Sequence, residues 1–420
     1  MKSSISKFYQ MGLKQRLQLV KKFANLNNND LRVLKSCGGL SFKSANVMSE
    51  NVIGTMAIPL GIATNFLINE RDYLIPMVIE EPSVIAATSN AAKIARVKGG
   101  FTAIADQSLM IGQIQVVDLQ KLLVSGEKVL ETKNKIIEIA NTKSRTLVNK
   151  GAGVRDVIFR VIDTIQGKML IVELIIDVRD AMGANIVNTM CEAVAPYIEN
   201  VTGGRALLKI LSNYTTKRLT RASVVFSKEE IGSEIVNDIL LAYAFAMSDQ
   251  YRCTTHNKGV MNGVIAVANA TGQDSRAIEA GAHSYAARNG KYSSLTSWSK
   301  DNNGDLIGSI EIPLAVGIVG GISSVHPLVK TCLKILHVKK AQDLACVMAS
   351  VGLAQNFAAL YALVSEGIQK GHMSLHARNV AVISGAKGKL IGIVAEIIAD
   401  EGNVTTHRAK EVLKNIKKQR

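Results

Sequence analysis

The order of strands and helices between residues 107 and 213 is the strongest constraint on the fold of this chain. Apolar alternation and turn residues predict a strand, a helix, two strands joined by a T-I-Q-G-K turn, a helix and a last strand. That βαββαβ order is the split arrangement of ferredoxin-like domains, so we expect an antiparallel sheet with both helices on one face. The expected elements are 109–117, 126–148, 154–163, 168–178, 182–201 and 206–211.

The sequence on either side of this unit is mainly helical, which predicts an α+β protein with a small domain inserted into a larger one. Helical spacing occurs over 11–37, with 40–60 in the same N-terminal helical layer, and Ala-rich helices are expected over 341–368. Two strands are expected around the turn D301-N-N-G-D305. We expect a large mixed helical substrate-binding domain (1–106 and 214–368), a small cofactor-binding domain (107–213) and a small mobile helical subdomain (369–420).

Net charge and aromatic content limit the classes of ligand or partner that this chain is expected to bind. The 420 residues carry a formal net charge of +16, which suits phosphate-bearing ligands, nucleic acid or a membrane surface. Nucleic acid is disfavoured because aromatic residues are only 5% and no zinc-finger or RNA-recognition pattern occurs. The apolar stretch 306–322 contains Glu311 and Pro313, so it is expected to be buried strand rather than a membrane span.

Cysteines and the N-terminus indicate the compartment. The five cysteines include no C-x-x-C pair, which is typical of reduced core thiols. The first residues lack the apolar region and cleavage site of a secretory signal. We therefore expect a cytoplasmic protein.

Four short polar segments supply acid and base chemistry in an otherwise apolar chain. They contain Glu81, Lys258, Asp274 and His372, which together could polarise a carbonyl, move protons and protonate a leaving group. Taken singly, each has a plainer explanation: a carboxylate before proline usually starts a helix, and a Lys or Asp among Gly and Asn usually lies in a solvated turn. Lys258 and Asp274 are accordingly expected on loops.

The amino-acid sequence of these motifs and of several others resembles the 3-hydroxy-3-methylglutaryl-coenzyme A (HMG-CoA) reductase family, in its soluble bacterial and archaeal class II form. The resemblance covers nearly the whole chain and rests on six ordered motifs. They are E50-N-V-I-G54, V78-I-E-E-P-S83, D180-A-M-G-A-N185, T255-H-N-K-G-V-M-N-G263, V351-G-L-A-Q-N356 and G371-H-M-S-L-H-A-R-N379.

The resemblance implies reduction of HMG-CoA to mevalonate and CoA with two NAD(P)H, through mevaldyl-CoA hemithioacetal and mevaldehyde, for isoprenoid synthesis. Mevalonate catabolism with NAD is an alternative within the family. A CoA thioester hydrolase, which would not need the D-A-M-G-A-N motif, and a basic nucleic-acid-binding module are alternatives outside it. The E-N-V-I-G motif implies a homodimer with active sites at the subunit interface.

By resemblance, Lys258 stabilises the developing oxyanion and Glu81 is the general acid, whose protonated form is favoured by apolar neighbours and Glu80. Asp274 would hold and tune both, and His372 would protonate the departing CoA thiolate. The spacing of His372 and His376 could suggest a metal pair, but no third ligand or H-E-x-x-H pattern accompanies it, so no metal is expected.

The resemblance also assigns binding residues. Substrate contacts are expected from Ser83, Arg252, Asn262, Gln355, Asn356 and His376, with the planar fork of Arg252 suited to a carboxylate. The absence of G-x-G-x-x-G disfavours an ordinary Rossmann domain. The cofactor is expected at Asp180, Met182, Gly183, Ala184, Asn185 and Asn188.

The segment N141-T-K-S-R145 bears on the choice of cofactor. Where NADH-using relatives place an aspartate, this chain has Ser144 flanked by Lys143 and Arg145. A carboxylate would repel a ribose 2′-phosphate, whereas a serine beside two cations attracts it. We therefore expect NADPH, with NADH as the alternative.

Overall fold

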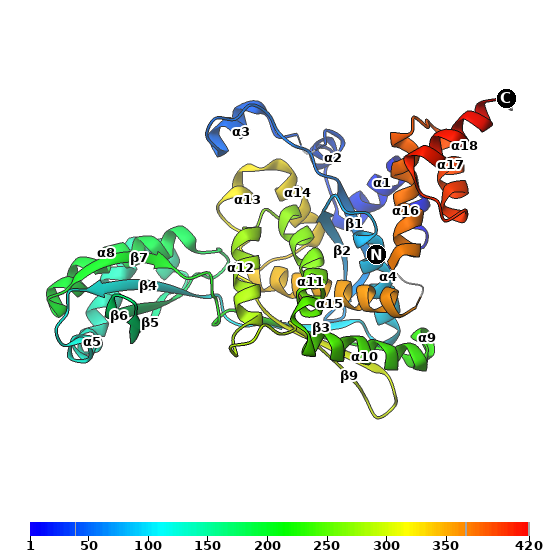
Figure 1. Cartoon of the computed structure of the whole chain (residues 1–420). Helices are drawn as coiled ribbons and strands as arrows, with labels where there is room; N and C mark the ends of the chain where they lie inside the picture. The colour runs from blue at the N-terminus through cyan, green and yellow to red at the C-terminus, as the bar shows by residue number, and fades with distance from the viewer. Residues whose placement is uncertain (38, 366–367, 419–420) are drawn as a thin grey trace.

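The computed structural model of the chain describes residues 1–37, 39–365 and 368–418, with side chains of the helix at 368–383 described from residue 376. Two separate sheets surrounded by helices confirm the α+β class. In Figure 1 the smaller sheet projects to one side of a central body, and the last three helices form a separate group on the opposite side.

The small domain has the predicted βαββαβ order. Its strands are β4 (Leu109–Val117), β5 (Gly153–Thr164), β6 (Gly167–Asp177) and β7 (Arg205–Leu211). They form an antiparallel sheet in the order β5-β6-β4-β7, as expected of a ferredoxin-like domain. Helix α8 (Ala184–Thr202) and the helices between β4 and β5 bury a common apolar core against it.

The expected helix 126–148 was wrong in its continuity. The segment forms α5 (Leu122–Glu131), α6 (Lys133–Asn141), η3 (Thr142–Ser144) and α7 (Arg145–Val148). The breaks coincide with polar side chains that bond to the backbone: the Thr132 hydroxyl donates to the Lys128 carbonyl at 3.0 Å, and the Asn141 amide oxygen accepts from the Val154 N–H at 2.9 Å. Such bonds compete with helix continuation.

The large domain is built on a six-stranded sheet in the order β2-β1-β3-β8-β10-β9. Among the described strands of this sheet, β1 and β3 pair in parallel and the other neighbours are antiparallel. The strands are β1 (Leu60–Ile68), β2 (Arg71–Val78), β3 (Phe101–Ala105), β8 (Leu219–Phe226), β9 (Thr296–Lys300) and β10 (Leu306–Pro313). The apolar strand expected over 306–322 is shorter than predicted, since β10 ends at Pro313. Proline lacks the N–H that would continue the hydrogen-bond ladder.

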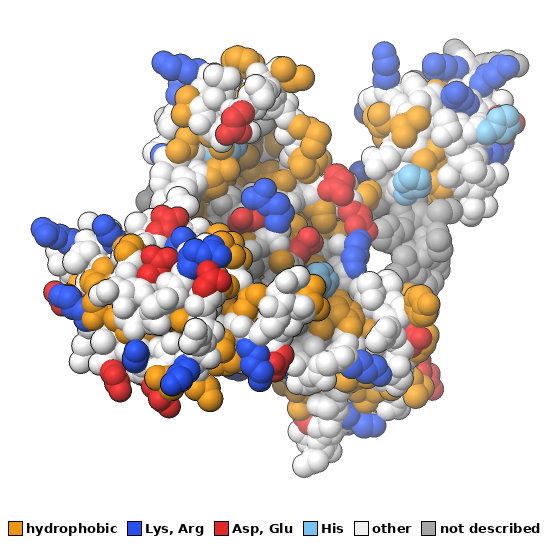
Figure 2. Space-filling view, turned by 60° about the vertical axis from the view of Figure 1, so that its left-hand side comes forward, with side chains coloured by type: hydrophobic (Ala, Val, Ile, Leu, Met, Phe, Trp, Pro, Cys, Tyr) orange, Lys and Arg blue, Asp and Glu red, His pale blue; other side chains and the backbone are white. Residues whose placement is uncertain are grey.

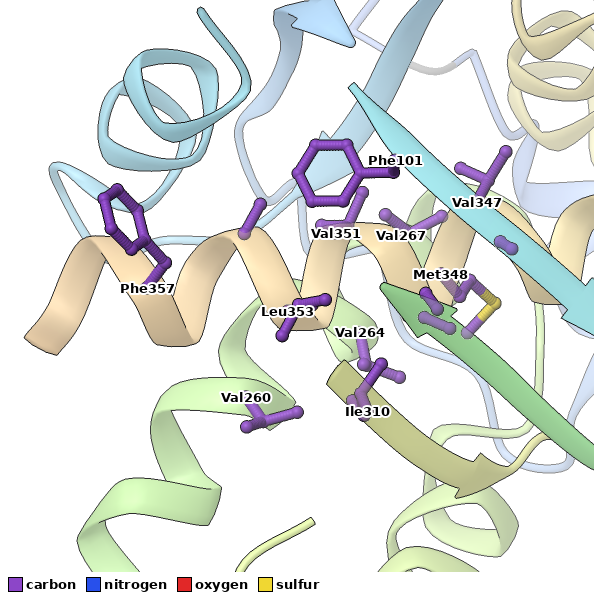
Figure 3. Packing of buried hydrophobic residues seen from close by; sticks show 14 of the residues in the cluster. Phe101, Val260, Val264, Val267, Ile310, Val347, Met348, Val351, Leu353 and Phe357 are labelled. Atoms are coloured by element: carbon purple, nitrogen blue, oxygen red, sulfur yellow. The ribbon is translucent and has the colours of Figure 1, made fainter. Parts of the chain in front are cut away.

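A central helix, α15 (Ala341–Val364), lies against this sheet and forms the middle of the core. Figure 3 shows its Val347, Met348 and Val351 beside Phe101 of β3 and Val264 of α11 (Gln250–Ala270). The expectation of several helices over 341–368 is corrected to one 24-residue helix followed by a separate α16. Within the described ranges α15 is the one helix long and apolar enough to cross a membrane, but 67% of that window is buried inside the protein, as in a core helix.

The expectation that Lys258 lies on a loop was wrong, because residues 255–263 lie in the middle of helix α11. Thr, Asn and Gly are weak helix formers, so local propensity favours a loop. Packing reverses that preference: a Cβ on Gly263 would lie 2.9 Å from the Val351 carbonyl oxygen, so only glycine lets α11 approach α15 this closely. The Asp249 carboxylate caps the helix by accepting from the Arg252 N–H at 2.7 Å.

The remaining helices flank this body. They are η1 (Phe8–Gln10), α1 (Leu13–Ala24), α2 (Asn28–Lys35), α4 (Val84–Ala95), η2 (Arg96–Lys98), α9 (Lys228–Ile231), α10 (Ser233–Ser248), α12 (Ser275–Ala286), α13 (Ile322–Val325) and α14 (Pro327–Leu336). Helices α16 (Ile368–Ile383), α17 (Lys389–Asp400) and α18 (Thr406–Lys418) enclose a small core of their own.

The segment 40–60 does not form the expected helical layer. Only α3 (Phe42–Met48) is helical, and residues 49–59 run without helix or strand to β1. We call residues 42–58 the arm. It exposes large apolar side chains, including Val47, Ile53 (98% exposed) and Met56 (85% exposed). In Figure 1 the arm extends away from the body at the top of the view.

A glycine pair on α11 tests the packing argument. We expect Gly263→Ala to lower the free energy of unfolding by about 1–2 kcal/mol through overpacking against α15. Gly259→Ala is the control one turn earlier, where the nearest atom to a new Cβ is 3.8 Å away, and should stabilise by about 0.5 kcal/mol through helix propensity. Urea unfolding followed by the fluorescence of Trp298, the single tryptophan, measures both. Equal effects would contradict the close-packing explanation.

Candidate active site

A pocket of about 650 Å³ gathers eight of the predicted site residues from four elements of the large domain and the C-terminal group. The face in Figure 2 is hollowed between the small domain, the arm and the C-terminal helices, and side chains of both charge signs lie in the hollow. The predicted residues that line the pocket are Glu81, Ser83, Arg252, Lys258, Asn262, Gln355, Asn356 and His376.

The acid–base centre of the pocket is a contact between Lys258 and Glu81. The Lys258 Nζ lies 3.0 Å from Glu81 Oε2, although 177 residues separate them. Glu81 follows β2 and precedes α4, where Ser83 at φ 74° turns the chain into the helix. The ammonium projects from the rigid middle of α11 and remains 60% exposed, so a ligand entering the pocket can reach it.

Arg252 has the properties of an anion-binding residue. It lines the same pocket two turns before Lys258, and burial lowers the pKa of its guanidinium. Among the residues that the structure describes, the guanidinium has no ion-pair or hydrogen-bond partner. A partly buried cation without a counter-ion suits a carboxylate ligand.

The two amide residues of the predicted substrate set are largely engaged within the protein. The Gln355 side-chain oxygen accepts from the Thr88 hydroxyl. Asn356 Oδ1 accepts from Thr296 Oγ1 and Trp298 Nε1, both at 2.9 Å. These bonds fix the orientation of both side chains in the pocket wall.

His256, which was not predicted, also lines the pocket. Its side chain is 2% exposed, and Nε2 lies 2.8 Å from Thr296 Oγ1. Burial, and then the charge of Arg252, lower its pKa to about 3. Its position within T255-H-N-K258, four residues after Arg252, could have indicated from the sequence that His256 lies at the site.

The D180-A-M-G-A-N185 motif connects the small domain to the body. Asp180 Oδ1 accepts from the Ala341 N–H at 2.9 Å, at the start of α15. Gly183 has φ 108° and precedes α8, so Ala184 and Asn185 form the helix N-terminus expected beside a pyrophosphate. The Asn188 side-chain oxygen accepts from the Leu211 N–H of β7 at 2.9 Å.

Arg218, a residue outside the prediction, holds this motif in place. It is 4% exposed and donates to the carbonyls of Ala181 at 3.3 Å, Met182 at 3.1 Å and Val316. Burial lowers its pKa to about 10, opposed by the carboxylates of Asp177 and Asp180.

The three residues predicted to select the cofactor lie together at the η3–α7 junction. Lys143 and Arg145 are exposed, and Ser144 between them is half-buried. In the described part of the chain neither cation has an ion-pair partner. Helix η3 contacts α8, the helix that begins within the D-A-M-G-A-N motif.

Asp274 does not reach Lys258 within one chain. It caps α12 by accepting from the Ala277 N–H at 3.1 Å, and its bond to Arg276 is the first cause that lowers its pKa. Helix rise alone places Lys258 about 18 Å along α11 from Ala270, its last residue, and Asp274, which follows that end of the helix, does not line the Lys258 pocket. The neighbouring Gln273 instead exchanges hydrogen bonds of 2.8 and 2.9 Å with Gly317, beside the D-A-M-G-A-N motif.

Each chain therefore carries two separated sets of site residues. The substrate set surrounds Lys258 in the middle of α11, whereas Gln273 and Asp274, beside the segment that contacts the D-A-M-G-A-N motif, follow the C-terminal end of that helix. The His372 side chain lies outside the described residues. Within those residues no group of three His, Cys, Asp or Glu could hold a metal ion.

The fold agrees with that of solved reductases. An HMG-CoA reductase from Streptococcus pneumoniae superposes with a TM-score of 0.84 at 38% identity, covering 98% of this chain and 99% of that chain. A class II HMG-CoA reductase from the same organism, bound to NADPH in open conformations, gives a TM-score of 0.82 at 38% identity over 97% of this chain and 100% of that chain.

Sequence comparisons give the family. The profile of hydroxymethylglutaryl-coenzyme A reductase matches residues 12–377. The HMG-CoA reductase of Archaeoglobus fulgidus is 56% identical over 99% of this chain and 95% of its own length. A probable HMG-CoA reductase of Borreliella burgdorferi is 35% identical over 79% of this chain and 77% of its own. The chain belongs to the hydroxymethylglutaryl-coenzyme A reductase family.

The burial of His256 predicts an acid-sensitive fold. Its folded pKa of about 3 lies below the unfolded value of 6.5, so the unfolded chain alone binds a proton between these pH values. Well above pH 6.5 the pKa difference of His256 does not change the free energy of unfolding. As pH falls from 6.5 towards 3, it lowers that free energy progressively. We expect His256→Gln to remove roughly 1 kcal/mol of the loss between pH 7.5 and 5.5, measured by urea unfolding at both pH values. An identical pH dependence in both proteins would contradict a neutral buried imidazole.

Proposed function

We propose that this chain reduces HMG-CoA to mevalonate and CoA in the cytoplasm with two NADPH, as a step towards isoprenoids. The observation that carries the proposal is the Lys258–Glu81 contact in a pocket that also presents an unpaired Arg252. Family membership supports the reaction, and the direction of synthesis is favoured over NAD-dependent catabolism by the cations at residues 143 and 145.

The large-domain pocket supplies the acid–base chemistry. The Lys258 ammonium stabilises negative charge on the thioester oxygen and, later, on the aldehyde oxygen. Glu81 donates a proton through the same contact and recovers it between the two reductions. Collapse of the hemithioacetal releases a thiolate, which His372 protonates. NADPH, when bound, supplies the two hydrides.

Substrate binding is assigned to the pocket walls. Arg252 binds the carboxylate of the substrate, with Ser83 and Asn262 beside it. His376 of α16 contacts the CoA portion at the pocket rim. We assign residues 369–420 as a flap that closes over bound CoA, and residues 1–106 and 214–368 as the substrate-binding domain.

The active unit is a homodimer in this proposal. Asp274 does not line the Lys258 pocket of its own chain, so in this proposal a complete site takes Asp274 and the cofactor set from the partner subunit. The arm, which contains E50-N-V-I-G54, exposes the apolar side chains expected of an interface. A twofold axis would build two equivalent sites.

Cofactor binding is assigned to the small domain, residues 107–213. The D180-A-M-G-A-N185 backbone and the start of α8 would receive the pyrophosphate. Ser144, with Lys143 and Arg145, would receive the 2′-phosphate of NADPH, the cofactor bound by the S. pneumoniae relative. Lys143 and Arg145 are exposed and have no ion-pair partner among the described residues, which supports this role.

A subunit-mixing experiment tests the reaction and the shared site together. Lys258→Ala and Asp274→Ala should each abolish oxidation of NADPH with HMG-CoA, followed at 340 nm. Coexpression of the two variants should restore about a quarter of wild-type activity, because half of randomly paired dimers are mixed and each has one intact site of two.

The controls separate the possible failures. Inactive wild type with HMG-CoA would overturn the reaction itself. Inactive mixtures, with both single variants folded and dimeric by light scattering, would show that Lys258 and Asp274 act from one chain and would overturn the shared site alone.

Replacement of Ser144 tests the cofactor assignment. We expect Ser144→Asp to raise the KM for NADPH roughly tenfold or more by repulsion of the 2′-phosphate, with the KM for NADH little changed. Ser144→Asn has a similar volume without charge and should keep the preference for NADPH. Parallel KM changes for both cofactors in Ser144→Asp would contradict contact with the phosphate.

A further inference from the structure

The hydrogen-bond network behind the pocket fixes the tautomer of His256. Trp298 Nε1 can only donate, so the Asn356 atom 2.9 Å away is its oxygen. Thr296 Oγ1 lies 2.9 Å from the same oxygen and must donate its single hydrogen to it. The Thr296 hydroxyl therefore accepts from His256, whose Nε2 at 2.8 Å carries the proton.

The other imidazole nitrogen is left as a buried acceptor. Burial holds the ring neutral, because its pKa is lowered to about 3, so Nδ1 keeps its lone pair. Nδ1 is buried and has no hydrogen-bond partner in the described part of the chain. An unsatisfied buried acceptor is costly, and in a native protein it commonly marks a functional constraint.

A matching donor lies one turn away on the same helix. Arg252 and His256 are four residues apart on α11, a spacing that stacks side chains on one face. Both line the pocket, and the Arg252 charge is close enough to lower the His256 pKa. Since the guanidinium has no partner among the described residues either, one group lacks a donor and its neighbour lacks an acceptor.

We propose that His256 is a positioning residue for Arg252: its Nδ1 accepts a hydrogen bond from the guanidinium as the substrate carboxylate docks. The inference rests on the proposed binding of that carboxylate by Arg252. With one N–H held by the imidazole, the other donors form a fixed fork for the two carboxylate oxygens.

A neutral acceptor suits this task better than a carboxylate. An aspartate at this position would also orient the guanidinium, but it would neutralise the charge that attracts the substrate. The imidazole orients the guanidinium and leaves its full positive charge for the substrate. The Thr296–Asn356–Trp298 network then serves to hold the proton on Nε2 and keep Nδ1 an acceptor.

Two substitutions of His256 separate positioning from structural support. In His256→Asn the amide oxygen takes the place of Nδ1 and the contact with Thr296 is lost. In His256→Gln the amide nitrogen reaches Thr296 and the Nδ1 acceptor is lost. We expect the Gln variant to raise the KM for HMG-CoA roughly tenfold with kcat changed less than about threefold, and the Asn variant to stay nearer wild type.

Arg252→Met and a substrate analogue complete the test. 3-Hydroxy-3-methylbutyryl-CoA lacks the free carboxylate, so its inhibition constant should be alike in wild type and the Gln variant. Equal KM increases in both His256 variants, or a milder Gln variant, would overturn the inference and leave His256 a wall residue. An unchanged KM in Arg252→Met would overturn the carboxylate assignment and the inference with it, although the reductase reaction would stand.

A wild-type measurement avoids dependence on variant folding. In protein labelled with 15N-histidine, the Nδ1 resonance that is absent from His256→Asn should shift towards the hydrogen-bonded range on addition of HMG-CoA. The same resonance should not move with 3-hydroxy-3-methylbutyryl-CoA. A resonance insensitive to both ligands would overturn the inference.

Discussion

The buried guanidinium of Arg218 is the interaction on which the arrangement of the site depends. It joins backbone carbonyls of the D-A-M-G-A-N motif to that of Val316 in the segment after β10. Around it, Asp180 accepts from the first residue of α15, and Gln273 bonds to Gly317. A cation can remain in this interior only because carbonyl dipoles and nearby carboxylates replace water. The core helix, the cofactor motif and the Asp274 turn are thereby fixed to one another.

The small domain could be predicted almost element by element, whereas α11 could not. Strand alternation and a tight turn are local signals, so β4 and β6 were expected to within a residue. The α11 segment contains Thr, Asn and two glycines, whose local preference is for a turn. What makes it helical is contact with α15, almost a hundred residues later, and a single sequence contains no local record of that contact.

Most of the pocket was predictable because its motifs resemble those of the family. Glu81, Arg252 and Lys258 do line one cavity. The internal partners of these side chains could not be predicted. Nothing in the sequence shows that Asn356 is bonded to Thr296 and Trp298, or that His256 has an acceptor without a donor. The position of Asp274 shows a second limit, since a motif does not record that Asp274 lies outside the Lys258 pocket of its own chain.

The exposed arm has a consequence for the life of the chain before assembly. Val47, Ile53 and Met56 lie in water on a segment with little regular structure, which is the kind of surface that chaperones and proteases recognise. For the homodimer proposed above, a newly made subunit that meets no second copy is open to cleavage at 49–59, and association would protect both chains by mass action. The abundance of the enzyme would then rise more steeply than its rate of synthesis, so that expression level sets both the amount of protein and its lifetime.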